Sequence, residues 1–150
     1  MNPGVQLKYG HVHGGEASVP VAMAASQVVS AQSGKFVYMN AGAATLNVDG
    51  STSIWGSLET HAHTPTVGDV INCIIDLTAI FRIPIDSGTY AVGMVGDTCD
   101  IAVSSSIQGA QLDASIENTL KVVNGDAANS EWVDVMMDAN VHGTTIGVDA

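Results

Sequence analysis

The sequence predicts an all-β domain, built as a small antiparallel β-barrel or sandwich with an extended N-terminal arm. Short apolar runs rich in Ile and Val recur along the chain, and Gly, Asp, Asn and Ser stand between them. These runs follow one another at intervals of roughly 8–15 residues, with hardly any helical pattern between them. Many short strands separated by turn residues are typical of barrels and sandwiches.

The clearest strand covers residues 79–85, near the middle of the chain. Phe81, Ile83 and Ile85 alternate there with more polar residues, which is the period of two of a half-buried strand. Pro84 has no N–H group to donate to a neighbouring strand. We therefore expect this strand to lie at an edge, or Pro84 to lie where the pairing ends.

Eight further strands are expected before and after it. They cover residues 17–23, 35–39, 45–48, 53–59, 70–77, 99–103, 120–123 and 132–137, of which the run at 70–77 precedes the central strand directly. Asp49-Gly50 is the strongest hairpin-turn signal, and Gly56 is expected at a bulge or a close approach. Residues 22–32 fit a helix or a strand, and residues 104–118 are expected to be irregular.

The chain divides into an arm at residues 1–15, one domain at residues 16–140 and a tail at residues 141–150. The arm contains Pro3 and several glycines, but Val5, Leu7, Tyr9 and Val12 stand at mostly alternate positions. Such a segment could add as a strand to another chain, which makes these four residues the expected partner-binding site. The alternative is a disordered terminus.

Charge is distributed unevenly over the sequence, whose net charge is −11. Residues 1–66 hold two basic and three acidic residues, whereas residues 67–150 hold two basic and twelve acidic residues. Four basic residues give no footprint for a phosphate backbone, so we expect no nucleic-acid partner. The near-neutral half is the better candidate for a protein contact.

The low charge content also favours contact with other subunits. Only 13% of the residues are charged, against roughly 25% in an average soluble domain, although 46% are hydrophobic. We expect a homo-oligomer whose uncharged surface is partly covered by other chains. No apolar stretch is long enough to span a membrane, and residues 1–15 have no apolar core of a signal peptide. Cys73 and Cys99 are expected to be buried and reduced.

Two His-x-His pairs are the only pattern that suggests metal binding. On a strand, His11 and His13 would share one face, as would His61 and His63, and Glu16 follows the first pair. The first pair and Glu16 resemble the metal motif of cupins, but the spacing to Glu16 is too short and no later His completes the set. A cupin-like metal-binding enzyme is therefore the alternative to a binding protein.

No other motif points to catalysis. Asp126, Asn129 and Glu131 crowd one turn, but they lack the spacing of a calcium-binding loop. The sequence contains no nucleophile elbow, phosphate-binding loop, dinucleotide fingerprint or zinc-protease motif. We expect no enzymatic activity and no cofactor.

Six short segments, taken in order, resemble the small β-barrel decoration (cement) proteins of tailed-bacteriophage capsids. They are Gly34-Lys35-Phe36-Val37, Ile54-Trp55-Gly56, Gly68-Asp69-Val70, Ile80-Phe81-Arg82-Ile83-Pro84-Ile85, Val95-Gly96-Asp97-x-Cys99-Asp100-Ile101 and Trp132-Val133-x-Val135. The likeness covers residues 17–138 and consists of a pattern of short segments.

The resemblance implies a structural virion protein, assembled in a host cytoplasm and bound to the outside of an icosahedral shell. Such proteins are often trimers, and they lock major capsid subunits together against the pressure of the packaged DNA. They commonly lay a terminal arm on the shell. A virion module associated with a tail or fibre is a further alternative with the same β content.

Overall fold

The computed structural model describes residues 9–60 and 68–142, in which the regular elements are strands and one short 3-10 helix. The strands are β1 (Gly10–His13), β2 (Ser18–Ala22), β3 (Phe36–Asn40), β4 (Ala43–Leu46), β5 (Gly56–Leu58), β6 (Val70–Ile74), β7 (Ile80–Ser87), β8 (Thr98–Ser104), β9 (Ile107–Gln111), β10 (Leu120–Gly125) and β11 (Trp132–Met137). The 3-10 helix, η1, covers Val92–Met94. The all-β prediction is confirmed. None of the helical structure in these two ranges is long or apolar enough to cross a membrane.

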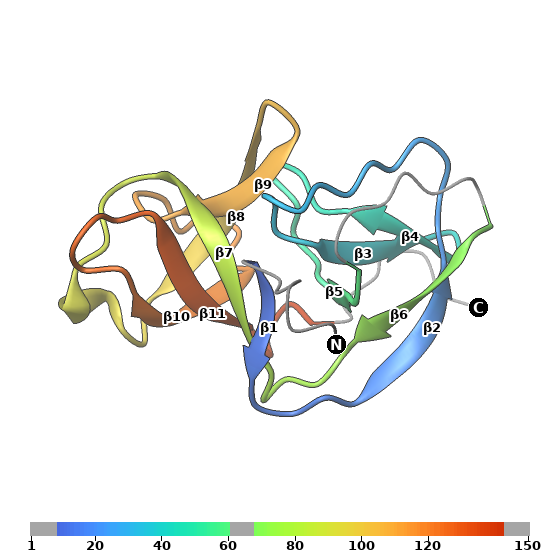
Figure 1. Ribbon diagram of the computed structural model, residues 1–150, viewed down its shortest axis with the longest axis horizontal. Helices are drawn as coiled ribbons and strands as arrows, with labels where there is room; N and C mark the ends of the chain where they lie inside the picture. Colours follow the sequence, from blue (N-terminus) through green and yellow to red (C-terminus); the bar gives the residue numbers. More distant parts are fainter. Residues whose placement is uncertain (1–8, 61–67, 143–150) are drawn as a thin grey trace.

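The strands form two sheets that lie side by side (Figure 1). Sheet A has the order β1-β7-β11-β10-β8-β9, and a parallel pairing of β9 with β7 brings it close to a closed ring. Sheet B has the order β2-β6-β5-β3-β4. A parallel bridge between Met23 and Ala44 joins its two outer strands. Both sheets therefore curl strongly, which leaves little exposed strand edge.

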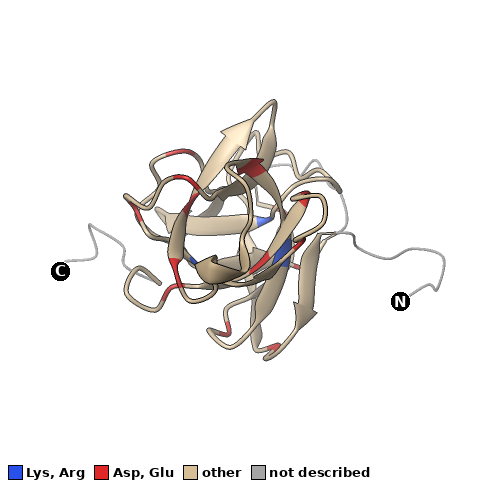
Figure 2. Cartoon of the chain, turned by 90° about the vertical axis from the view of Figure 1, so that its left-hand side faces the viewer, with Lys and Arg blue, Asp and Glu red and all other residues tan. Residues whose placement is uncertain are grey.

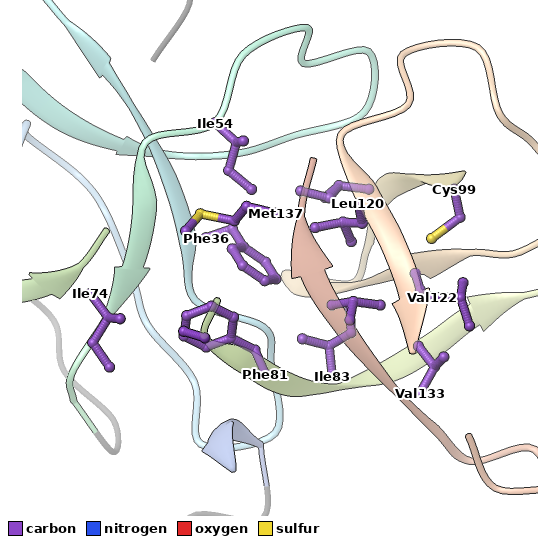
Figure 3. Packing of buried hydrophobic residues seen from close by; sticks show 14 of the residues in the cluster. Phe36, Ile54, Ile74, Phe81, Ile83, Cys99, Leu120, Val122, Val133 and Met137 are labelled. Carbon is purple, nitrogen blue, oxygen red and sulfur yellow. The ribbon is translucent and has the colours of Figure 1, made fainter. Parts of the chain in front are cut away.

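One hydrophobic core lies inside sheet A and extends to sheet B. Phe81, Ile83 and Val133 from sheet A are at most 1% exposed, and Phe36 from β3 enters the same cluster (Figure 3). The rings of Phe36 and Phe81 meet edge to face, with centroids 5.2 Å apart. A second cluster lies within sheet B, around Met23, Val37 and Cys73. Because Phe36 belongs to the larger cluster, the two sheets form one packed unit.

Strand β7 has the alternation that the sequence predicts, and it also explains Pro84. The N–H group of Ile85 donates to Glu131 O on the β11 side, so the nitrogen of Pro84 faces the opposite side of β7. On that side β1 pairs with residues 80–82, and β9 pairs from Ile85 onward. Pro84 thus lies between two partner strands, where the chain needs no donor.

Three local expectations differ from the structure. Residues 22–32 do not form one helix or strand, because β2 ends at Ala22 and turns with isolated bridges follow, in which Ser26 has a φ of 62°. Residues 104–118, expected to be irregular, contain β9. Asp49-Gly50 does not connect two paired strands, because β4 pairs with β3 whereas β5 pairs with β3 and β6.

Turn chemistry explains the missed strand. The β8–β9 hairpin turns at Ser105 and Ser106, whose φ angles are 51° and 64°. Two-residue hairpins favour positive φ at both turn positions, and Asn-Gly is the usual pair there. Two serines in these conformations give no such signal, and therefore the hairpin was not visible in the sequence.

The folded unit extends beyond residues 16–140 at both ends of the described chain. Tyr9 is only 5% exposed, and β1 pairs with β7 of the same chain. At the other end, the N–H group of Ile54 donates to Val141 O, and His142 stacks on Trp55 with ring centroids 5.8 Å apart. The described parts of the expected arm and tail thus pack on the domain itself.

Candidate contact surface

The described part of the arm is fixed by a buried lysine. Lys35, 1% exposed, donates hydrogen bonds from Nζ to Tyr9 O at 3.0 Å and to Ser33 O at 2.9 Å. Burial lowers the pKa of this ammonium group to about 8. Lys35 therefore ties the residue that precedes β1 to the start of β3.

Of the four arm residues predicted to bind a partner, two are described. Tyr9 is buried in its own domain, whereas Val12 in β1 is 39% exposed. Val5 and Leu7 lie outside the described residues. Val12 is thus the arm residue whose side chain the described structure leaves accessible to a partner.

The predicted metal ligands do not come together in the described part of the chain. A β-bulge between His11 and His13 shifts the register of β1, which breaks the alternation that would place both rings on one face. His11 lies against Phe81, and its Nδ1 is 3.8 Å from Glu16 Oε1, too far for a hydrogen bond. Residues 9–60 and 68–142 contain no group of three or more His, Cys, Asp or Glu arranged to hold a metal ion. His61 and His63 lie outside these ranges.

The acidic turn considered for calcium is held by its own backbone. The carboxylate of Asp126 accepts N–H groups from Ala128, Asn129 and Glu131 at 3.1–3.2 Å. The pKa of Asp126 is lowered, chiefly by the N–H group of Asn129. This side chain closes the loop between β10 and β11, as Asp commonly does in turns.

Asp100 has the same kind of role in a buried position. It is 2% exposed, and its carboxylate accepts the N–H groups of Ile116, Glu117 and Asn118 at 2.8–3.0 Å. Burial opposes its ionisation, but the three donors outweigh burial and leave its pKa below the usual value. Asp100 thus organises the segment between β9 and β10.

Two of the four basic residues are engaged within the domain. Lys35 is buried, and Arg82 on β7 forms a two-pronged ion pair with Asp134 on β11, with N–O distances of 2.8 and 3.1 Å. The Arg82 guanidinium also lies 3.6 Å from the centre of the Trp132 ring. Little positive charge is therefore left to offset the carboxylates around sheet A, which Figure 2 shows spread over its loops.

Sheet B differs sharply from this acidic side. None of its five strands contains Asp, Glu, Lys, Arg or His. Val28, Val48 and Val70 lie in or beside these strands and are 50–66% exposed. Sheet B thus contains four strands of the near-neutral half that the sequence predicts, with β6 added from the acidic half, and exposed apolar side chains lie on it.

A groove runs between sheet B and the β8–β9 hairpin. Val28, Leu46, Val48 and Val103 line it, together with polar side chains, around a volume of about 310 Å³. We call these four residues the junction groove. It is the apolar hollow that the near-neutral half offers to a partner.

Gln108 on β9 holds the two sides of this groove in place. Its Nε2 donates to Phe36 O and Asn47 O, both at 3.0 Å, while its Oε1 accepts the N–H group of Phe36 at 2.8 Å. Its main-chain N–H donates to Ser33 Oγ at 2.7 Å. Gln108 thus fixes the hairpin of sheet A to strand β3 of sheet B. This role of Gln108 could not be predicted from the sequence, because a single Gln in a polar segment gives no indication that its side chain is buried.

Both cysteines are buried free thiols, as predicted. Cys73 belongs to the core of sheet B and Cys99 to the core of sheet A. Burial raises the pKa of each thiol to about 12. Neither thiol therefore has the character of a nucleophile.

Comparison of the chain with models of protein families, with curated proteins and with solved structures found no match.

Proposed function

We propose that this chain is a structural virion protein that binds the outside of an icosahedral capsid and stabilises contacts between major capsid subunits. The proposal rests on the resemblance to capsid decoration proteins and on one observation of the structure. That observation is the separation of charge between the two sheets, with an uncharged sheet B and an acidic periphery around sheet A.

Sheet B is the face that contacts the shell in this proposal. Its exposed valines and the junction groove, whose own lining contains no charged residue, offer apolar area that is buried on binding. Val12 extends the contact from the neighbouring strand β1. The acidic side then faces outward, where it repels stray nucleic acid.

Each contact with the shell can be weak, because several copies act together. A homotrimer presents three such faces to neighbouring capsid subunits, and the second and third contacts form at a high effective concentration. The bound protein then opposes outward movement of the subunits. No step of this role requires a catalytic residue or a cofactor.

Cosedimentation with empty capsids, assembled from the major capsid protein of the same source, tests the proposal. Val28→Asp and Val48→Asp place a charge in the junction groove, and both positions are about half exposed, so the fold should tolerate the change. We expect each variant to bind at least about tenfold more weakly, because a charge is buried without a partner.

Ile116→Asp is the matched control, since Ile116 is 80% exposed and belongs to sheet A's loops. It should bind as the unaltered protein does. If the unaltered protein does not sediment with capsids, the proposed function fails. If it binds to tails or fibres instead, the alternative virion module is correct.

A further inference from the structure

The core of sheet A is open to solvent at one end. Met94 and Leu112 close that end only in part, and between them lies a pocket of about 380 Å³. Its floor is formed by Cys99 of β8 and Val122 of β10, both members of the core. The pocket thus has a mixed lining, in which apolar side chains stand beside polar groups, and it is large enough for one bulky side chain.

The lining of this pocket carries negative charge only. Asp97 and Asp113 line it, and no Lys, Arg or His does. The hydroxyl of Ser87 donates to Asp113 at 2.7 Å, which holds that carboxylate in position. Lys121 in β10 is exposed and pairs with the pocket residue Thr98, so this basic residue adjoins the pocket although it does not line it.

Exposed apolar residues adjoin the pocket residues in the sequence. Val92 and Val95 flank Met94 and are 77% and 48% exposed, and Ile116 follows the pocket residue Ser115 and is 80% exposed. None of the three lines the pocket itself. A small molecule inside the pocket would leave them in water, whereas a polypeptide lying across it would cover them.

This end of sheet A lies away from sheet B. Figure 1 shows the loop after β7 and the end of β10 at the far left, with sheet B at the right. The pocket is therefore separate from the junction groove, and the argument for it does not depend on the proposed function.

We propose that the pocket at the open end of sheet A binds a polypeptide segment of a partner that presents one large apolar side chain flanked by Lys or Arg. The apolar side chain enters between Met94 and Leu112, and the basic residues meet Asp97 and Asp113. Charge complementarity selects this partner, because an acidic segment would meet two carboxylates without a counter-charge. A second copy presenting the same end is disfavoured for the same reason.

Titration of the isotope-labelled protein with synthetic peptides, followed by NMR, tests the proposal. The probe is a heptapeptide in which one Phe stands between two pairs of Lys. One comparison peptide replaces the Lys residues by Glu, and another replaces Phe by Gly. We expect saturable shifts at Met94, Thr98 and Ala114, with at least about tenfold weaker binding of both comparison peptides.

Variants locate the contact. Asp97→Asn and Asp113→Asn should each weaken the Lys peptide about threefold to tenfold, and Ala114→Leu, which fills the pocket, should abolish the shifts. Glu59→Gln removes the same charge beside sheet B and should leave the affinity unchanged. Equal binding of all three peptides, shifts confined to sheet B, or unchanged affinity in the Asp97→Asn and Asp113→Asn variants would overturn the proposal.

Discussion

Lys35 Nζ donates a hydrogen bond to the main-chain oxygen of Tyr9 across 26 positions of sequence. The ammonium group is buried, and it bonds to two carbonyl oxygens, those of Tyr9 and Ser33. Carbonyl oxygens compensate only part of the cost of removing this charge from water, so the pKa is lowered to about 8. The contribution of Lys35 to the stability of the fold is thus sensitive to pH.

The first prediction concerns the pH dependence of stability. The folded pKa of Lys35 is about 8 and the model-peptide value is 10.5, so between these pH values the unfolded chain binds more protons than the folded one. The contribution of Lys35 to the free energy of unfolding therefore rises with pH over that window, by at most about 1.4 kcal/mol per pH unit. The neutral amine still has donors for both carbonyl oxygens.

Lys35→Met isolates this effect from that of the cysteines. The unaltered protein and the Lys35→Met variant share the two buried thiols, whose pKa is raised from 9.0 to about 12. The free energy of unfolding of both proteins therefore falls above pH 9 for this reason. The difference in free energy of unfolding between the unaltered protein and the variant, measured in urea, should grow from pH 8 to pH 10.5. A difference that stays constant over this range would show that Lys35 titrates normally.

The second prediction concerns the contact between the sheets. Gln108→Ala removes the acceptor of Phe36 N and the side-chain donor to Asn47 O, two main-chain groups of buried residues, whereas Phe36 O keeps the N–H group of Asn47. Each buried group left without a partner costs about 1–3 kcal/mol, so the variant should lose about 2–4 kcal/mol in urea unfolding. Gln32→Ala, at an exposed position, should unfold almost as the unaltered protein does. Equal stability of the two variants would contradict the assigned role of Gln108.

The third prediction compares two glycines. A Cβ atom on Gly56 would lie 2.4 Å from Ile74 O and 2.6 Å from Cys73 Sγ, whereas one on Gly93 would have no heavy atom within 4 Å. Gly56→Ala should therefore destabilise the protein by about 2–4 kcal/mol, because β5 and β6 must separate. Gly93→Ala should change the melting temperature little. A tolerated Gly56→Ala would mean that β5 and β6 are not so closely packed.

The fourth prediction concerns the thiols. Cys73 and Cys99 are at most 1% exposed, and burial raises their pKa values to about 12. Iodoacetamide at pH 8 should leave both cysteines of the folded protein unmodified, while both should react in urea, as measured by mass spectrometry. Rapid modification of the folded protein would show that one of the two cores opens readily.

Periodicity predicted the fold class and the positions of β2, β3, β6, β7, β8, β10 and β11. In β7 the buried Phe81 and Ile83 alternate with less buried residues as the apolar pattern predicts, so this prediction needed no knowledge of partners. Which strands pair is a different matter. Asp49-Gly50 is a strong turn signal, but the short strand after it, β5, binds β3 and β6, because tertiary packing decides pairing.

The candidate surfaces were predictable only in part. The charge difference between the two halves of the sequence corresponds only in part to the two sheets, since β6 of sheet B comes from the acidic half and β1 of sheet A from the near-neutral half. The arm residue Tyr9 was not recognisable as buried, because its burial depends on Lys35 and on β7, which lie far along the chain. Residues from four separate segments line the pocket at the end of sheet A, so no local pattern in the sequence could predict it.

The orientation of the protein on a capsid tests the central claim most directly. A cryo-electron microscopy reconstruction of capsids incubated with the protein would show which sheet faces the shell. The account predicts sheet B and Val12 against the capsid, with η1 and the acidic loops of sheet A pointing outward. Density in which sheet A contacts the shell, or a shell without added density at saturating protein, would contradict it.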